Sequence, residues 1–166
     1  TFDFFWLLVT NKLLNFILYF ILSVIYLKKE NLKKYGLLLF SLGIMILFTD
    51  QVTNIFKYAF ARLRPCHNDD ILNNIRLLKS NCGGLYGYFS AHASNSFALA
   101  VFFSNLFFKR INKLPFLLLT FASLVSYSRI YIGVHYPFDV ISGAIFGIFS
   151  GYMSYTLFKR YIQINT

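Results

Sequence analysis

Long apolar runs separated by short polar turns dominate this chain. About 20 consecutive apolar residues are enough for a helix to cross the hydrocarbon core of a bilayer. The runs cover approximately residues 7–27, 35–56, 90–108, 114–127 and 137–158. The pattern therefore predicts an all-α integral membrane protein, a bundle of about five transmembrane helices. The bundle would have six helices if the segment before the first run forms a helix of its own.

One segment, residues 62–88, interrupts this pattern. It contains Pro65 and many Asn, Asp and Gly residues, which favour turns and loops. We expect it to be the one sizeable loop region outside the membrane. Because no internal repeat or low-complexity linker divides the sequence, we expect residues 1–166 to form a single membrane-embedded domain.

The composition agrees with a membrane location. With 57% hydrophobic and 13% charged residues, the 166-residue chain is too apolar to hide its side chains inside one soluble globule of this size. Aromatic residues make up 20% of the chain, which suits a lipid-facing surface and belts at the membrane interfaces. We expect no cleavable signal peptide, since lysines follow the first apolar run where a small-residue cleavage site would stand.

The basic residues indicate how the chain is oriented. They gather in two turns and at the end of the last run, in residues 28–34, 109–113 and 159–160. Basic segments next to membrane spans stay in the cytoplasm, so residues 62–88 and the amino-terminal end are expected on the opposite, outer side. The net charge of +10 does not indicate nucleic acid binding, because the cations do not form one soluble face with aromatic residues between them.

Two cysteines, Cys66 and Cys82, flank the outer loop and form a candidate disulfide. In the oxidising environment of a bacterial envelope a bridge between them would close a loop of about 15 residues and contribute up to ~3 kcal/mol. Two free thiols remain the alternative, because spacing alone does not establish the geometry of a bridge. With no Cys or His array beside them, we expect no metal site.

The strongest chemical signal lies at the start of the last run, where His135 and Asp139 are four residues apart. On a helix this spacing lets the carboxylate accept the Nδ1 proton and leaves Nε2 free as a nucleophile. A histidine held by a structural hydrogen bond is the alternative. Gly143, Gly147 and Gly151 continue the interval of four and predict a small-residue face for close helix packing.

A second cluster precedes the third run. Ser90 fits a helix N-cap, and the backbone amides around Ala91 can hold phosphate oxygens while His92 protonates a leaving group. Alone, Ser90 would be an ordinary cap.

Three cations, Lys57, Arg64 and Arg129, complete a set able to hold phosphate. Cations at membrane boundaries are usually headgroup anchors, and we interpret Arg62 in this way. Other polar residues near the outer side receive structural or solvent-exposed roles. Lys12 is expected to reach the interface, Arg76 and Lys79 to be solvated loop charges, and Asp50 to be satisfied by a hydrogen bond inside the bundle.

In order along the chain, these clusters resemble the three-part signature of the type 2 phosphatidic acid phosphatase superfamily. The first part is Lys57 with Arg64-Pro65, the second is Ser90-Ala91-His92, and the third is Ser128-Arg129 with His135 and Asp139. The match covers residues 57–139. Two positions depart from the usual Pro-Ser-Gly-His of the second part, namely Phe89 for the proline and Ala91 for the glycine. The residue types that carry the chemistry are intact.

The resemblance implies an all-helical core and a phosphatase that needs no metal or cofactor and works through a phosphohistidine. It assigns His135 as nucleophile, Asp139 as the carboxylate that orients it, and His92 as acid for the leaving group. The phosphate is held by Lys57, Arg64, Ser90, Ala91 and Arg129.

The same resemblance implies a multi-pass enzyme of the bacterial inner membrane with its site facing the periplasm. Its partners would be the bilayer and a lipid with a phosphate or pyrophosphate headgroup, with no nucleic acid and no obligate protein partner. Our leading expectation is a lipid A 1-phosphatase, and undecaprenyl pyrophosphate and phosphatidylglycerol phosphate are the alternative substrates. A non-catalytic phospholipid-binding protein is a remote alternative.

Overall fold

The computed structural model describes residues 2–79 and 81–164, and within them the protein is all helical. Seven α-helices are formed, together with a short 3-10 helix, η1, at Pro65–His67. The α-helices are α1 (Asp3–Val9), α2 (Lys12–Leu27), α3 (Leu32–Phe60), α4 (Asp69–Leu72), α5 (Ala91–Phe107), α6 (Leu114–Tyr131) and α7 (Pro137–Ile164). The all-α fold predicted from the apolar runs is confirmed.

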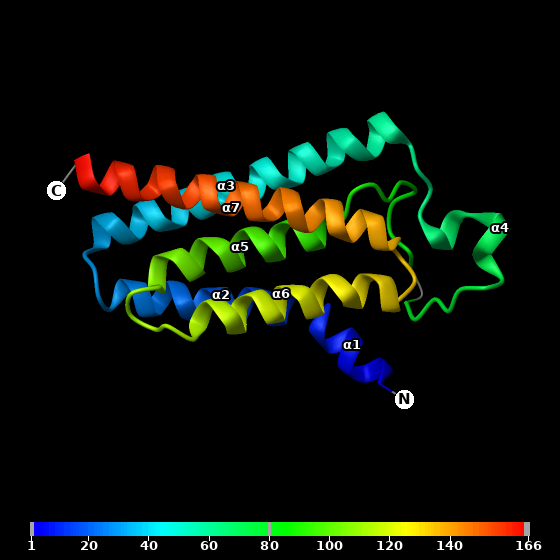
Figure 1. Cartoon of the computed structure of the whole chain (residues 1–166), viewed down its shortest axis with the longest axis horizontal. Helices are drawn as coiled ribbons and strands as arrows, with labels where there is room; N and C mark the ends of the chain where they lie inside the picture. Colours follow the sequence, from blue (N-terminus) through cyan, green and yellow to red (C-terminus); the bar gives the residue numbers. More distant parts are fainter. Residues whose placement is uncertain (1, 80, 165–166) are drawn as a thin grey trace.

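Five long helices, α2, α3, α5, α6 and α7, run side by side, and the short helices α1 and α4 lie at one end of them (Figure 1). The two basic turns and the end of α7 lie at the opposite end (Figure 1). There Glu30 links the turns, since its carboxylate accepts from Lys34 Nζ at 3.1 Å and from Arg110 at 3.0 Å. The basic segments and the loop region are therefore at opposite ends of the bundle, as the sequence predicts.

Not every helix of the bundle meets the length and composition of a membrane span. Helices α3, α6 and α7 are long and apolar enough, and α1 with α2 makes a fourth if the bent pair is one span. Helix α5 has 17 residues, about 25 Å, and stands inside the bundle with Phe102, Phe103 and Phe107 buried. We predicted about five spans, and the structure supports three or four by this measure.

The first apolar run is broken where we predicted a continuous helix. Helix α1 ends at Val9 and meets α2 at an angle of 49°. The cause is local, because Asn11 is the N-cap of α2 and its side chain accepts from the Leu13 amide at 2.8 Å. The seven residues of α1 then pack on α6, where the Trp6 ring lies 5.0 Å from that of Tyr127. The break brings Thr10 to the outer end of the bundle.

Helices α5 and α7 pack with their backbones in contact along the predicted glycine face. A methyl group added at Gly143 would lie 2.5 Å from the Ser90 carbonyl oxygen. At Gly147 the same addition would lie 2.3 Å from the carbonyl oxygen of Ser94. Because only glycine permits this approach, the sequence fixes α7 against α5 at close range. We call this contact the glycine seam.

Candidate active site

A cavity of about 350 Å³ opens at the outer end of the bundle and collects most of the predicted site residues. Its lining includes Lys57, Arg64, Ala91, His92, Arg129 and His135. The remaining two predicted residues, Ser90 and Asp139, are fully buried and bonded to each other, since the Ser90 amide donates to the Asp139 carbonyl oxygen at 3.0 Å. Residues as far apart in sequence as Lys57 and His135 thus meet around one space.

The buried Asp139 carboxylate holds His135. Its Oδ2 atom lies 3.3 Å from His135 Nδ1 and also accepts from the Tyr136 amide at 2.9 Å. Spacing of four residues predicts this contact. Because Nδ1 faces the carboxylate, Nε2 is the ring nitrogen left for the cavity. Burial, with the positive charges of Arg64 and Arg129, lowers the pKa of His135 well below 6.5 and keeps the imidazole neutral.

The Asp139 carboxylate has a third partner, Arg62, which sequence reasoning missed. The guanidinium of Arg62 donates to Asp139 Oδ1, so Arg62 is not the headgroup anchor we predicted. Helix α3 ends at Phe60 and Ala61 takes the left-handed conformation with φ of 46°, which turns the chain back over the bundle. The guanidinium also lies 4.9 Å from the centre of the Tyr88 ring. No local pattern signals this pairing, because it depends on that reversal.

The start of α5 supplies backbone donors to the cavity. Ser90 is the N-cap, and its side chain accepts from the Ala93 amide at 3.4 Å, as the sequence predicts. The first amides of a helix have no partner within the helix, so those at Ala91 and His92 are available to phosphate oxygens. Ala91 itself lines the cavity.

The guanidinium groups are held in place by loops and by α1. Arg64 donates from Nε to the Tyr86 carbonyl oxygen at 3.2 Å, and from its terminal nitrogen to that of Cys82 at 3.3 Å. Arg64 lies in the loop beyond the end of α3, the helix that carries Lys57. Arg129, in the last turn of α6, donates to Thr10 Oγ1 at 2.7 Å. Thr10 is a second residue that sequence reasoning missed.

Two lysines that we placed elsewhere also line the cavity. They are Lys12, expected at the interface, and Lys79, expected to be a solvated loop charge. Burial, with Arg129 and Lys12 nearby, lowers the pKa of Lys79 from its ordinary value. The lining therefore has five cationic side chains, and no carboxylate of the described residues belongs to it. The charges suit a multiply charged anion.

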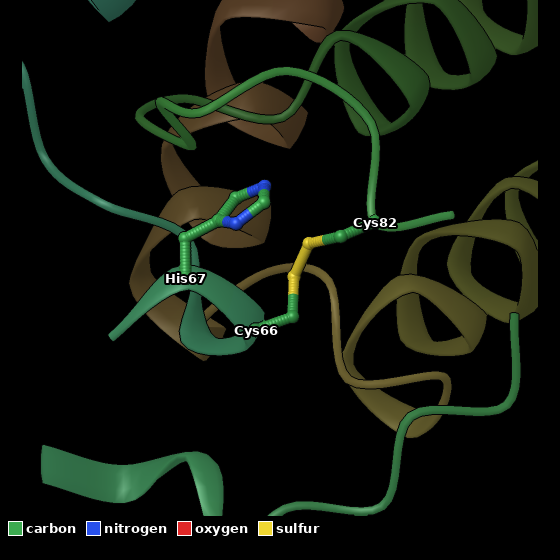
Figure 2. A group of neighbouring side chains, drawn as sticks. All are labelled: Cys66, His67 and Cys82. Atoms are coloured by element: carbon green, nitrogen blue, oxygen red, sulfur yellow. A yellow bond between two sulfur atoms is a disulfide. The ribbon is translucent and has the colours of Figure 1, made fainter. Parts of the chain in front are cut away.

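The outer loop is fastened beside this cavity by Cys66 and Cys82, whose sulfur atoms are joined as a disulfide in Figure 2. Their Cα atoms are 6.2 Å apart, within the range of disulfides. His67 lies next to them, so the three side chains could be mistaken for a metal site. Bonded sulfur atoms are not thiolates, and the group does not fit a metal centre in this form. The pairing itself stays a prediction.

Comparison with known proteins agrees with this geometry. The sequence profile of the PAP2 superfamily matches residues 35–163. A lipid A 4'-phosphatase of Bacteroides thetaiotaomicron is 35% identical over 155 residues, which is 92% of this chain and 68% of that protein. The chain therefore belongs to the PAP2 superfamily, and it is a hydrolase of the lipid phosphatase class.

Further relatives include a lipid A 4'-phosphatase of Porphyromonas gingivalis, 37% identical over 68% of this chain and 48% of its own length. An undecaprenyl-diphosphatase of Sulfolobus acidocaldarius is 36% identical over 60% of this chain and 45% of that protein. The chain thus spans about half the length of these two proteins.

Two solved structures share the fold. The PAP2-type phosphatidylglycerolphosphate phosphatase from Bacillus subtilis has a TM-score of 0.73 at 17% identity and covers 95% of this chain and 77% of that one. Aquifex aeolicus LpxE has a TM-score of 0.66 at 25% identity and covers 92% and 84%. Together with the apolar helices, these similarities establish an integral multi-pass membrane protein.

Proposed function

We propose that this protein hydrolyses the 4'-phosphate of lipid A through a phosphohistidine on His135. The observation that carries the proposal is the single cavity in which His92, His135 and five cations face one another, beside the amides that begin α5. The lipid A phosphatases among the relatives act at the 4' position. We therefore replace our expectation of the 1-phosphate with the 4'-phosphate.

The proposed reaction uses two histidines in turn. His135 Nε2 forms a bond to phosphorus while the bond between phosphorus and the lipid oxygen breaks, and His92 gives that oxygen a proton. Water then attacks the phosphohistidine, His92 takes a proton from the water, and phosphate leaves with Nε2 restored. Asp139 keeps the proton on Nδ1 of His135, which leaves Nε2 with the lone pair that the attack requires.

The cations stabilise the charge that develops on the phosphate oxygens during transfer. Arg64 and Arg129 are each held by neutral oxygen atoms, so their positive charges are not neutralised by a carboxylate. Such preorganised donors in a partly buried site are worth on the order of 3 kcal/mol each. We propose that the chain lies in a bacterial inner membrane with this cavity facing the periplasm, which the basic turns at the other end of the bundle support.

Undecaprenyl pyrophosphate is the second candidate substrate. The five cations that line the cavity favour it, because a pyrophosphate carries more negative charge than a phosphate monoester. The undecaprenyl-diphosphatase among the relatives points in the same direction. Lipid A remains the first candidate substrate, because a lipid A phosphatase aligns with a larger share of this chain than the undecaprenyl-diphosphatase does.

The test is phosphate release by the purified protein in detergent. Lipid A, undecaprenyl pyrophosphate, phosphatidylglycerol phosphate and phosphatidate are compared, each with and without EDTA. We expect release from lipid A to be fastest, to come from the 4' position by mass spectrometry, and to be unchanged by EDTA. His135→Ala should abolish release while the protein elutes as the wild type does in gel filtration. Binding of lipid A without release by the wild type would instead support the non-catalytic alternative.

A further inference from the structure

A second cavity adjoins the phosphate site and opens along the bundle. Its volume is about 600 Å³, and most of its lining is apolar, with side chains from α2, α3 and α5 such as Phe16, Phe20, Leu39 and Leu99. It shares Lys12 and His92 with the phosphate cavity, so the two spaces lie next to each other at those side chains. A lipid whose phosphate occupies the first cavity has room for a chain in the second. We call the second cavity the chain groove.

Among the described residues, the wall of the chain groove carries one carboxylate, that of Asp50 on α3. Its Oδ1 atom accepts from Asn95 Nδ2 at 2.8 Å, and the Asn95 carbonyl oxygen in turn accepts from the Thr49 hydroxyl. This chain of hydrogen bonds fixes which end of the Asn95 amide faces Asp50. Within residues 2–79 and 81–164, no hydrogen bond uses Asp50 Oδ2. One acceptor of a charged group therefore remains for a ligand in the groove.

The depth of Asp50 selects which part of a lipid can reach it. Asp50 lies seven residues before Lys57 on the same helix, about 10 Å deeper in the bundle. Asp50 thus lies below the level of the phosphate, on the side where a lipid has the linkages that join its chains to the headgroup and not the ends of those chains. Amide N–H and hydroxyl groups occur at those linkages in some lipids, whereas ester-linked and prenyl lipids offer no donor there.

We propose that Asp50 and Asn95 form a specificity site that accepts a hydrogen bond from an amide or hydroxyl donor on the lipid close to the scissile phosphate. This inference rests on the proposed function and narrows it to lipids with such donors, of which the hydroxyacyl amides of lipid A are an example. A carboxylate facing a largely apolar groove is costly unless it is paired. A lipid that brings a donor satisfies it, and a lipid without one leaves it unpaired, which discriminates between them.

The experiment compares two lipids that differ in their donors and share chain length and a phosphate monoester. Ceramide 1-phosphate has an amide N–H and a hydroxyl group, and phosphatidate has esters. We expect the wild type to prefer ceramide 1-phosphate by about tenfold in kcat/KM, the effect of one hydrogen bond to a charged group. Asp50→Asn should remove that preference, because the bond from Asn95 fixes the new carbonyl oxygen and turns the new amide N–H₂ toward the groove.

Two further variants keep the result interpretable. Asp70→Asn removes the same charge from exposed α4 and should leave the preference at the wild-type value. Asn95→Ala keeps the Asp50 acceptor and removes the group that orients it, so it should reduce the preference in part. It also serves as the test if Asp50→Asn fails to elute as a single species in gel filtration.

The possible results separate this inference from the proposed function. Equal kcat/KM of the wild type for the two lipids, or no turnover of either, overturns the specificity site. An equal loss on both lipids in Asp50→Asn also overturns it, because the effect would then not depend on a donor on the lipid. Failure of the wild type to release phosphate from lipid A overturns the proposed substrate, and it is seen in a separate assay.

Discussion

The two sides of α5 differ in how closely their neighbours approach. On one side the glycine seam brings α7 into contact with the α5 backbone, and Gly147 has no room for a methyl group. On the other side α2 and α3 leave the chain groove of about 600 Å³, and Gly43 on its wall has no atom within 4 Å of an added Cβ. Both sides meet the phosphate cavity at the outer end. The closed side holds the proposed nucleophile, and the open side has room for the lipid.

This contrast separates two requirements of the enzyme. The groups that act on phosphorus need fixed positions, and backbone contact between α5 and α7 provides them. The lipid needs a path that admits a long chain, and loose packing beside α2 and α3 provides that. The following tests address the closed side, the open side and the loop that connects them.

The largest effect is expected on the closed side, from Asp139→Asn. The amide does not favour the tautomer with Nε2 free, so kcat should fall by about four orders of magnitude on every substrate. This result would contrast with Asp50→Asn on the open side, which should alter only the choice of lipid. The measurement is steady-state phosphate release, with thermal unfolding in detergent to check the fold. A variant that keeps a tenth of the wild-type kcat would contradict the assigned role.

A substitution of glycine by alanine tests the packing difference itself. Gly147→Ala should lower the free energy of unfolding by about 1–3 kcal/mol, since the methyl group meets a backbone oxygen that has no room to move. Gly43→Ala adds the same atom to the open side and should be neutral or stabilising by up to about 1 kcal/mol, because alanine favours helix. Circular dichroism during thermal unfolding in detergent measures both. Equal destabilisation by the two substitutions would remove the distinction between the sides.

The outer loop holds Arg64 at the phosphate cavity, where the two sides of α5 meet. Reduction of the bond between Cys66 and Cys82 tests this role of the loop. Mass spectrometry of the unreduced protein should first show Cys66 and Cys82 joined. Reduction should then lower stability by at most ~3 kcal/mol and reduce kcat/KM by a few-fold, because the Cys82 carbonyl oxygen holds Arg64. The double variant Cys66→Ser, Cys82→Ser should have the stability and kcat/KM of the reduced protein, and adding reductant should change neither. Two free thiols in the oxidised preparation would contradict the pairing.

The smallest effect concerns pH. The pKa of His135 lies well below 6.5, so the attacking imidazole stays neutral down to that pH, and the acid limb of kcat/KM should lie below pH 6.5. The unfolded chain binds a proton at His135 near pH 6.5 and the folded chain does not. The stability contributed by this group is therefore present above pH 6.5 and is lost as the pH falls below it. Rates and thermal unfolding from pH 5 to 8 check both statements, with His67→Gln, at a partly exposed histidine that does not line the cavity, as control. An acid limb centred above pH 6.5 would contradict them.

How much of this structure can be predicted from the sequence depends on how far apart along the chain the interacting residues are. Features set within one or two helical turns were predicted correctly, such as the contact of His135 with Asp139 and the cap at Ser90. The glycine face was also evident, because its interval of four is a property of one helix. The break before α2 has a local cause in the Asn11 cap, and we missed it because apolar residues continue on both sides.

Interactions across the bundle were not predictable in the same way. Arg62 reaches Asp139 only because α3 ends at Phe60 and the chain reverses, and our sequence analysis interpreted Arg62 as a headgroup anchor. Lys79 enters the phosphate cavity because the outer loop folds back over it. Such residues look like ordinary surface charges in the sequence, since nothing near them identifies the partner.

The hydrogen bond from the Ser90 amide to the Asp139 carbonyl oxygen, 3.0 Å long, ties the starts of α5 and α7 together just above the first glycine contact. His92 lies two residues beyond one end of this bond and His135 four residues before the other. Bending or tilting of the bundle as the surrounding bilayer changes will therefore carry the two imidazoles as one unit. The distance between the proposed acid, His92, and the proposed nucleophile, His135, is set by α5 and α7 alone. The other helices are therefore free to move apart when a lipid enters.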